Sequence, residues 1–150
     1  MHLCLSQVKL LGKIANGQGI APDPEMLKDM ENFPIPRNSK LSFLGLCGVF
    51  MNFIPDYMRL AEPLYKITRK DSIWKWELEE QNAFENLKKA MLSPSILHHP
   101  DFSKDFHIFS DASLIGGGAV LMQEHNGTLF PVSYASWTLS VTTPLQKEKC

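Results

Sequence analysis

The spacing of apolar residues changes once along this chain, close to residue 93, and this change limits the folds that are possible. Before it, apolar residues recur every three or four positions, as Leu60, Leu64 and Ile67 do, which is the spacing of one face of an α-helix. After it, the residues from Phe106 to Asp111 follow a period of two, which is typical of a β-strand. The sequence therefore predicts an α+β chain with a helical part first and a sheet second.

Helix signals fill the first part. Asp23-Pro24-Glu25 predicts a helix start, because a capping carboxylate is followed by proline at the first helical position. Further helices are expected from Ser39 to Phe50, from Tyr57 to Arg69 and from Glu77 to Leu92. Ahead of them, the turn signal Asn16-Gly17-Gln18-Gly19 lies between two short apolar runs and predicts a small hairpin.

The second part contains strand and turn signals. Strands are expected at Phe106–Asp111, at Ala119–Leu121 and at Leu129–Ala135. Asn126-Gly127 is a strong signal for a two-residue hairpin turn between the last two.

Composition excludes several classes of protein. A formal net charge of -1 gives no general attraction to phosphate, so any contact with nucleic acid must be local. The three cysteines are widely spaced, which favours neither a disulfide framework nor a zinc site. The longest apolar run, Phe43 to Met51, is too short to cross a bilayer. We therefore expect a soluble intracellular chain, cytoplasmic or nuclear, that has no membrane partner.

Asp111 is the main candidate for chemistry. It stands at the end of an alternating run and before Gly116-Gly117-Gly118, so a sheet could hold its carboxylate rigidly for metal binding. Taken alone, such an acid is more often an ordinary turn residue.

Several short blocks together carry a resemblance to a known family. In order along the chain they include Phe43-Leu44-Gly45, Phe53-Ile54-Pro55, Glu62-Pro63-Leu64, Pro100-Asp101-Phe102, Ser110-Asp111-Ala112-Ser113 and Tyr134-Ala135-Ser136. This order resembles the Pol polyproteins of Gypsy-type LTR retrotransposons and endogenous retroviruses, and the resemblance covers essentially the whole chain.

The resemblance implies three regions. Residues 1–22 would end the reverse transcriptase palm, with a primer-grip-like hairpin around Leu11 and Gly12. Residues 23–93 would form thumb and connection helices. Residues 94–150 would be a truncated ribonuclease H-like domain with an incomplete mixed β-sheet.

The family activity is RNA-directed DNA synthesis coupled to cleavage of RNA in RNA–DNA hybrids, with Mg²⁺ as cofactor. By resemblance, Asp111 is the first catalytic carboxylate and metal ligand. The second acid would fall at Lys149, one residue from Glu148, and the polymerase acids would precede Met1. Whether the chain is an enzyme is therefore left open. We expect it to need the missing palm and ribonuclease H segments of a longer polyprotein, and not to hold magnesium stably by itself.

Candidate contacts to RNA–DNA hybrid or primer-template are Leu11, Gly12, Lys66, Arg69 and Lys70. The three basic residues have a plainer interpretation as a solvated helix end. The alternative function is a non-catalytic nucleic-acid- or protein-binding remnant of an endogenous retroelement. An independent small enzyme has little support, because no catalytic set is complete.

Overall fold

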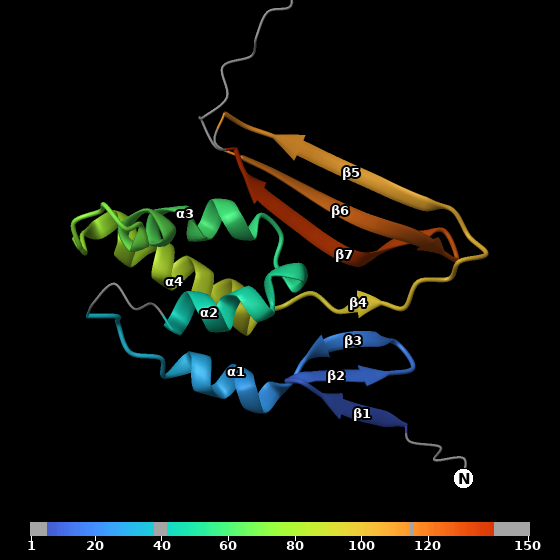
Figure 1. Ribbon diagram of the computed structural model, residues 1–150. Helices are drawn as coiled ribbons and strands as arrows, with labels where there is room; N and C mark the ends of the chain where they lie inside the picture. The colour runs from blue at the N-terminus through green and yellow to red at the C-terminus, as the bar shows by residue number, and fades with distance from the viewer. Residues whose placement is uncertain (1–5, 38–41, 115, 140–150) are drawn as a thin grey trace, which may run out of the picture.

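The computed structural model describes residues 6–37, 42–114 and 116–139. Helices gather on the left of Figure 1, and two sheets lie on the right, one above the other. Every strand pairing in the described residues is antiparallel. The α+β class is confirmed. The parallel pairing that a mixed sheet implies is not seen in this part of the chain.

The lower sheet has the order β1-β2-β3-β4. Its strands are β1 (Gln7–Leu10), β2 (Lys13–Asn16), β3 (Gly19–Pro22) and β4 (Leu97–His98). The predicted turn joins β2 to β3, where the Asn16 side chain accepts the backbone N–H groups of Gln18 and Gly19 at 2.9 and 3.2 Å. A second hairpin joins β1 to β2. Its turn residues Leu11 and Gly12 both have positive φ, 49° and 74°, as a two-residue hairpin turn requires.

β4 brings the second part of the chain into the first sheet. Leu97 pairs with Ile20 and His98 with Gly19, although more than 70 residues separate the two strands. The strand at Leu97–His98 therefore extends the N-terminal sheet, and it pairs with none of the later strands that the structure describes.

The four predicted helices are confirmed. They are α1 (Pro24–Glu31), α2 (Ser42–Val49), α3 (Tyr57–Thr68) and α4 (Leu78–Leu92). The second is shorter than expected at its C-terminal end, because a 3₁₀ turn at Met51–Phe53 follows it, while the expected cap Ser39 lies outside the described residues. No helix in the described ranges is long and apolar enough to cross a membrane.

The helices enclose the core, which is made mostly of large apolar side chains. Phe43 of α2 packs on Phe84 of α4 with ring centroids 4.6 Å apart. Leu97 of β4 joins the same cluster, so the lower sheet and the helices share one core. Burial raises the pKa of the Cys47 thiol to about 12, which keeps this core cysteine protonated at neutral pH.

The upper sheet has the order β5-β6-β7 and carries the candidate site. It consists of β5 (Phe106–Ala112), β6 (Gly116–His125) and β7 (Thr128–Thr138). The predicted turn at Asn126 and Gly127 is confirmed, with φ of 54° and 79°. The sheet is attached to the helices by β7, whose Ser136 hydroxyl accepts the backbone N–H of Met58 at 3.1 Å. This contact places one end of the sheet against the start of α3.

Candidate functional site

Asp111 lies near the end of β5, as the sequence predicts. Its neighbour across the sheet is Gly118 of β6, and its side chain is exposed. Just beyond Asp111, the Ser113 backbone N–H donates a hydrogen bond of 2.7 Å to the carbonyl of Gly116, the first residue of β6. The Ser113 hydroxyl donates to the same carbonyl at 3.1 Å.

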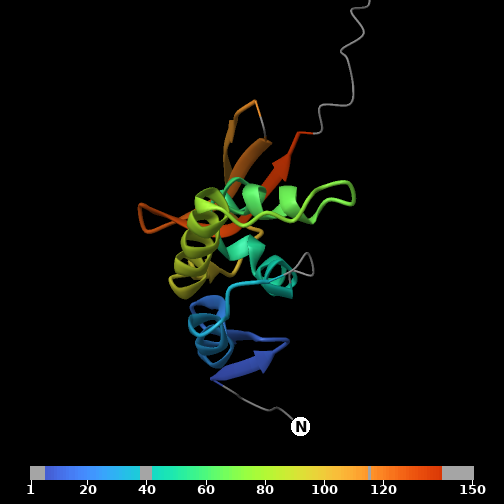
Figure 2. The same cartoon turned by 90° about the vertical axis from the view of Figure 1, so that its left-hand side faces the viewer.

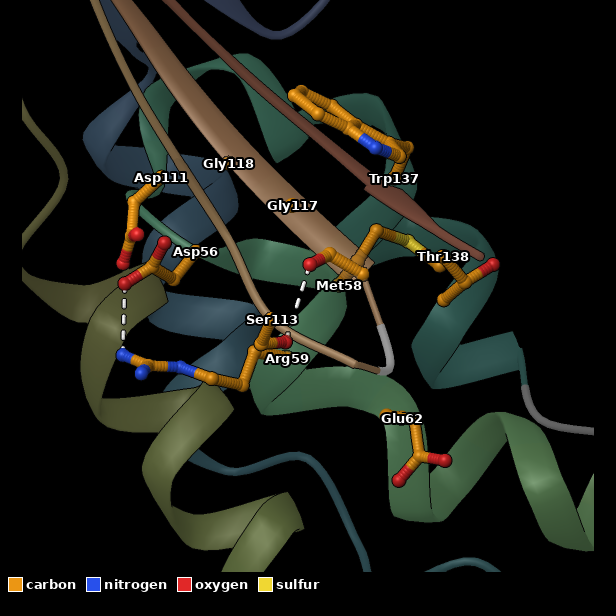
Figure 3. A pocket seen from close by; sticks show the side chains of 11 residues that line it. Asp56, Met58, Arg59, Glu62, Asp111, Ser113, Gly117, Gly118, Trp137 and Thr138 are labelled. Carbon is orange, nitrogen blue, oxygen red and sulfur yellow. Dashed lines mark hydrogen bonds and ion pairs between the residues drawn. The ribbon is translucent and has the colours of Figure 1, made fainter. Parts of the chain in front are cut away.

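A small pocket of about 50 Å³ opens beside Asp111 (Figure 3). One wall comes from the sheet and the other from the first turns of α3 and the residue before it. The charged residues that line the pocket are Asp56, Arg59, Glu62 and Asp111. The pocket therefore combines three carboxylates with one guanidinium.

Asp56, the residue before α3, lies between the helix and the upper sheet. Its backbone is left-handed, with φ 53° and ψ 30°, and its carboxylate pairs with Arg59 at 2.8 Å. A Cβ atom at Gly118 would lie 2.7 Å from Asp56 Oδ1. A side chain at position 118 would therefore push Asp56 out of the pocket, so the glycine lets the two carboxylates of Asp56 and Asp111 face the same space (Figure 3).

The described residues do not by themselves complete a magnesium centre at this pocket. Across the described ranges, no group of three or more His, Cys, Asp or Glu side chains is arranged to hold a metal ion. A two-metal nuclease site needs several carboxylates that converge on the ions, and here Arg59 neutralises one of the neighbours of Asp111. Glu148 and Lys149 lie outside the described residues.

Leu11 and Gly12 form the tip of the β1–β2 hairpin. The Leu11 side chain is 85% exposed. Gly12 lies tightly against α1, because a Cβ there would collide with the Met26 sulfur, and its carbonyl accepts the Asp23 backbone N–H at 2.8 Å. The tip is thus a fixed apolar projection.

The predicted basic residues at the end of α3 differ in their surroundings. Lys66 forms an ion pair with Glu62 at 3.0 Å. Arg69 and Lys70 are exposed and have no ion-pair partner in the part of the chain that the structure describes. Their cationic groups are therefore the more available of the three for an anionic partner.

The structure does not bring all these residues together. Asp111 lies by the first residues of α3 and Arg69 follows its last residue. A helix of this length spans roughly 18 Å at 1.5 Å per residue. The sequence prediction missed Asp56 and Arg59. The Pro55-Asp56 pair signals a helix start, but nothing in it indicates that the acid reaches a distant strand.

Parts of known proteins are similar in sequence to this chain. Residues 76–146 match a family described as the RNase H-like domain found in reverse transcriptase. Over 134 residues the chain is 36% identical to the retrovirus-related Pol polyprotein from transposon 412 of Drosophila melanogaster, covering 88% of this chain and 11% of that protein. It is 37% identical over 138 residues to the transposon Tf2-3 polyprotein of Schizosaccharomyces pombe, and this match covers 90% of this chain and 10% of that protein.

The chain is related to the Pol polyproteins of retroelements. It corresponds to their reverse transcriptase and ribonuclease H region, and it spans about a tenth of the length of these relatives. The matched family model starts at residue 76 and so includes α4 together with the upper sheet.

Solved structures agree with this relationship to retroelement polymerases. A foamy viral protease-reverse transcriptase in complex with double-stranded DNA matches with a TM-score of 0.76 and 25% identity, over 92% of this chain and 29% of that one. The same viral protein in complex with an RNA/DNA hybrid matches with a TM-score of 0.74 and 25% identity, over 91% of this chain and 19% of that one. The likeness therefore covers both the helical part and the sheets.

Proposed function

We propose that this chain is a nucleic-acid-binding segment of a reverse transcriptase–ribonuclease H and that its catalysis depends on other parts of a longer polyprotein. The observation that carries this proposal is the position of Asp111. It lies at the exposed end of β5, within a run that resembles the family's first metal-binding acid, and no complete metal-ligand group accompanies it among the described residues.

The parts of the chain have separate roles in this proposal. Residues 1–22 end the palm and present Leu11 and Gly12 to a primer strand. Residues 23–93 supply the thumb and connection helices, and residues 94–150 the first part of a ribonuclease H-like domain. The partners are an RNA–DNA hybrid or primer-template, and the palm and remaining ribonuclease H segments. Such a protein works inside the cell, in the cytoplasm or nucleus.

Cleavage of RNA in a hybrid uses two divalent ions to activate water and to stabilise the leaving oxygen. Mg²⁺ is the expected ion. The described residues offer it Asp111, so we expect the other ligands to come from elsewhere in the polyprotein and the chain to bind nucleic acid without cutting it.

A second function, a non-catalytic binding remnant, is favoured by one observation. Arg59 places a cation in the Asp111 pocket, where it holds Asp56 at 2.8 Å. A guanidinium in this position competes with a metal ion for the carboxylates, so nucleic-acid or protein binding could persist without any metal dependence.

The test is binding of the purified chain to an RNA–DNA hybrid across a salt series, with Mg²⁺ and after its removal by chelation. We expect saturable binding that weakens with salt, because phosphate contacts release counterions, and no cleavage. If part of the affinity depends on Mg²⁺, Asp111→Asn should abolish that part, whereas Asp105→Asn, an exposed acid before the same strand, should not.

The outcomes separate the candidates. Binding that gains affinity with Mg²⁺ and loses that gain in Asp111→Asn would favour the reverse transcriptase–ribonuclease H segment over the non-catalytic remnant. A folded chain that binds no hybrid at any salt concentration would exclude both functions.

A further inference from the structure

The connection between α3 and α4, residues 69–77, projects beyond the ends of both helices (Figure 2). We call it the α3–α4 finger. Its base is held in place by aromatic packing. The Trp76 ring meets Phe84 of α4 edge to face with centroids 5.9 Å apart, and its Nε1–H donates to the Gln81 side chain at 2.9 Å. Trp74 stacks on Trp76, also at 5.9 Å. The finger is therefore a supported projection.

Two of the basic residues near the finger are already paired. Lys66 contacts Glu62, and Lys75 contacts Glu77 at 2.6 Å. Arg69 and Lys70, at the start of the finger, have no such partner in the described ranges, and the exposed Asp71 is their neighbour in sequence. The finger thus carries a net positive charge at its start.

Ile73 lies three residues beyond Lys70 and is 88% exposed. Removing a large aliphatic side chain from water against an apolar surface is favourable. A single exposed isoleucine is common on proteins. Here it lies near two exposed cations, Arg69 and Lys70, on a supported projection, so one surface offers both positive charge and an apolar contact.

We propose that the α3–α4 finger docks in the minor groove of a nucleic-acid duplex, with Arg69 and Lys70 on backbone phosphates and Ile73 against the sugars. This inference rests on the proposed nucleic-acid-binding function and adds a contact to it. The charge of Arg69 and Lys70 complements phosphate. Aliphatic side chains enter minor grooves, and the minor groove of an A-form helix is wide and shallow enough to accept one. A single strand offers no such groove.

The two kinds of contact predict different salt behaviour. Each phosphate contact adds about 0.9 to the slope of log affinity against log salt concentration on B-form DNA. The double variant Arg69→Gln, Lys70→Gln should therefore lower the slope on duplex DNA by about 1.8. Ile73→Ser should weaken duplex binding about tenfold at every salt concentration and leave the slope unchanged, because an apolar contact releases no counterions.

The experiment measures the affinities of the full chain and its variants for duplex DNA, RNA–DNA hybrid and single-stranded DNA by fluorescence anisotropy. Two matched controls are available: Lys28→Gln removes an exposed cation of α1, and Ile35→Ser removes an aliphatic side chain that is 49% exposed. Both should leave duplex binding unchanged. Circular dichroism checks that each variant is folded.

Each outcome has one meaning. If the unaltered chain binds no duplex or hybrid, the proposed function fails and the docking fails with it. If the chain binds duplex and the finger variants behave like the controls, the docking alone is overturned. A loss with Ile73→Ser that is equal on single-stranded DNA would also overturn it, because the contact would then not depend on a groove.

Discussion

Asp23 joins the first hairpin to the first helix through three interactions. Its carboxylate accepts the Glu25 backbone N–H at 3.0 Å and so caps α1. The same carboxylate forms an ion pair with Lys9 of β1 at 3.2 Å, and its backbone N–H donates to Gly12. The backbone hydrogen bond from Glu25 and the contact with Lys9 hold the pKa of Asp23 below its ordinary value.

This lowered pKa predicts a pH dependence. A carboxyl whose pKa is lower in the folded than in the unfolded chain stabilises the fold above its unfolded pKa, near 4, and loses that effect as pH falls through the folded pKa. We expect the urea concentration at the midpoint of unfolding to decrease as the pH is lowered below about 4. In Asp23→Asn this decrease should be smaller, because asparagine caps a helix but does not titrate. Equal pH profiles for the two chains would contradict this.

At the scale of elements, the pairing of β3 with β4 depends on Gly19. A Cβ at this position would collide with the Leu97 carbonyl oxygen. Because the obstacle is backbone, it cannot rotate away, and the two strands would have to separate. This pairing is the contact that carries Leu97 into the core.

Gly19→Ala should therefore lower the free energy of unfolding by about 1–3 kcal/mol, the usual range for overpacking. Gly17→Ala is the matched control, because no atom lies within 4 Å of its added Cβ, and it should change the stability by less than about 0.5 kcal/mol. Urea denaturation followed by circular dichroism measures both. Similar losses for the two variants would show that the β3–β4 contact does not limit stability.

The whole molecule depends on one core that the helices share with the lower sheet. Phe84 of α4 is 1% exposed. It contacts Phe43 of α2 and Trp76 of the α3–α4 finger, so its ring links the helices to the support of the projecting segment.

Phe84→Ala should lower the free energy of unfolding by about 3–5 kcal/mol, because it removes buried apolar surface and leaves a cavity. Leu78→Ala on the same helix removes a side chain that is 74% exposed and should cost less than about 0.5 kcal/mol. Chemical denaturation gives both values. A small loss for Phe84→Ala would mean that the core relaxes around the cavity.

Local sequence patterns predicted much of this protein. The helices followed from a period of three to four residues, and the Asp23 cap and the Asn126-Gly127 turn followed from residue types at adjacent positions. Each of these features depends on residues that are close together in the sequence, where backbone sterics and nearby hydrogen bonds dominate. The position of Asp111 near the end of a strand was predictable from the local sequence in the same way.

Only the tertiary structure decided the rest. It pairs β4 with β3 and places the left-handed Asp56 against Gly118. These are contacts between side chains and strands whose positions no local pattern encodes. They depend on how the helices pack around a common core, because that packing determines which distant segments meet.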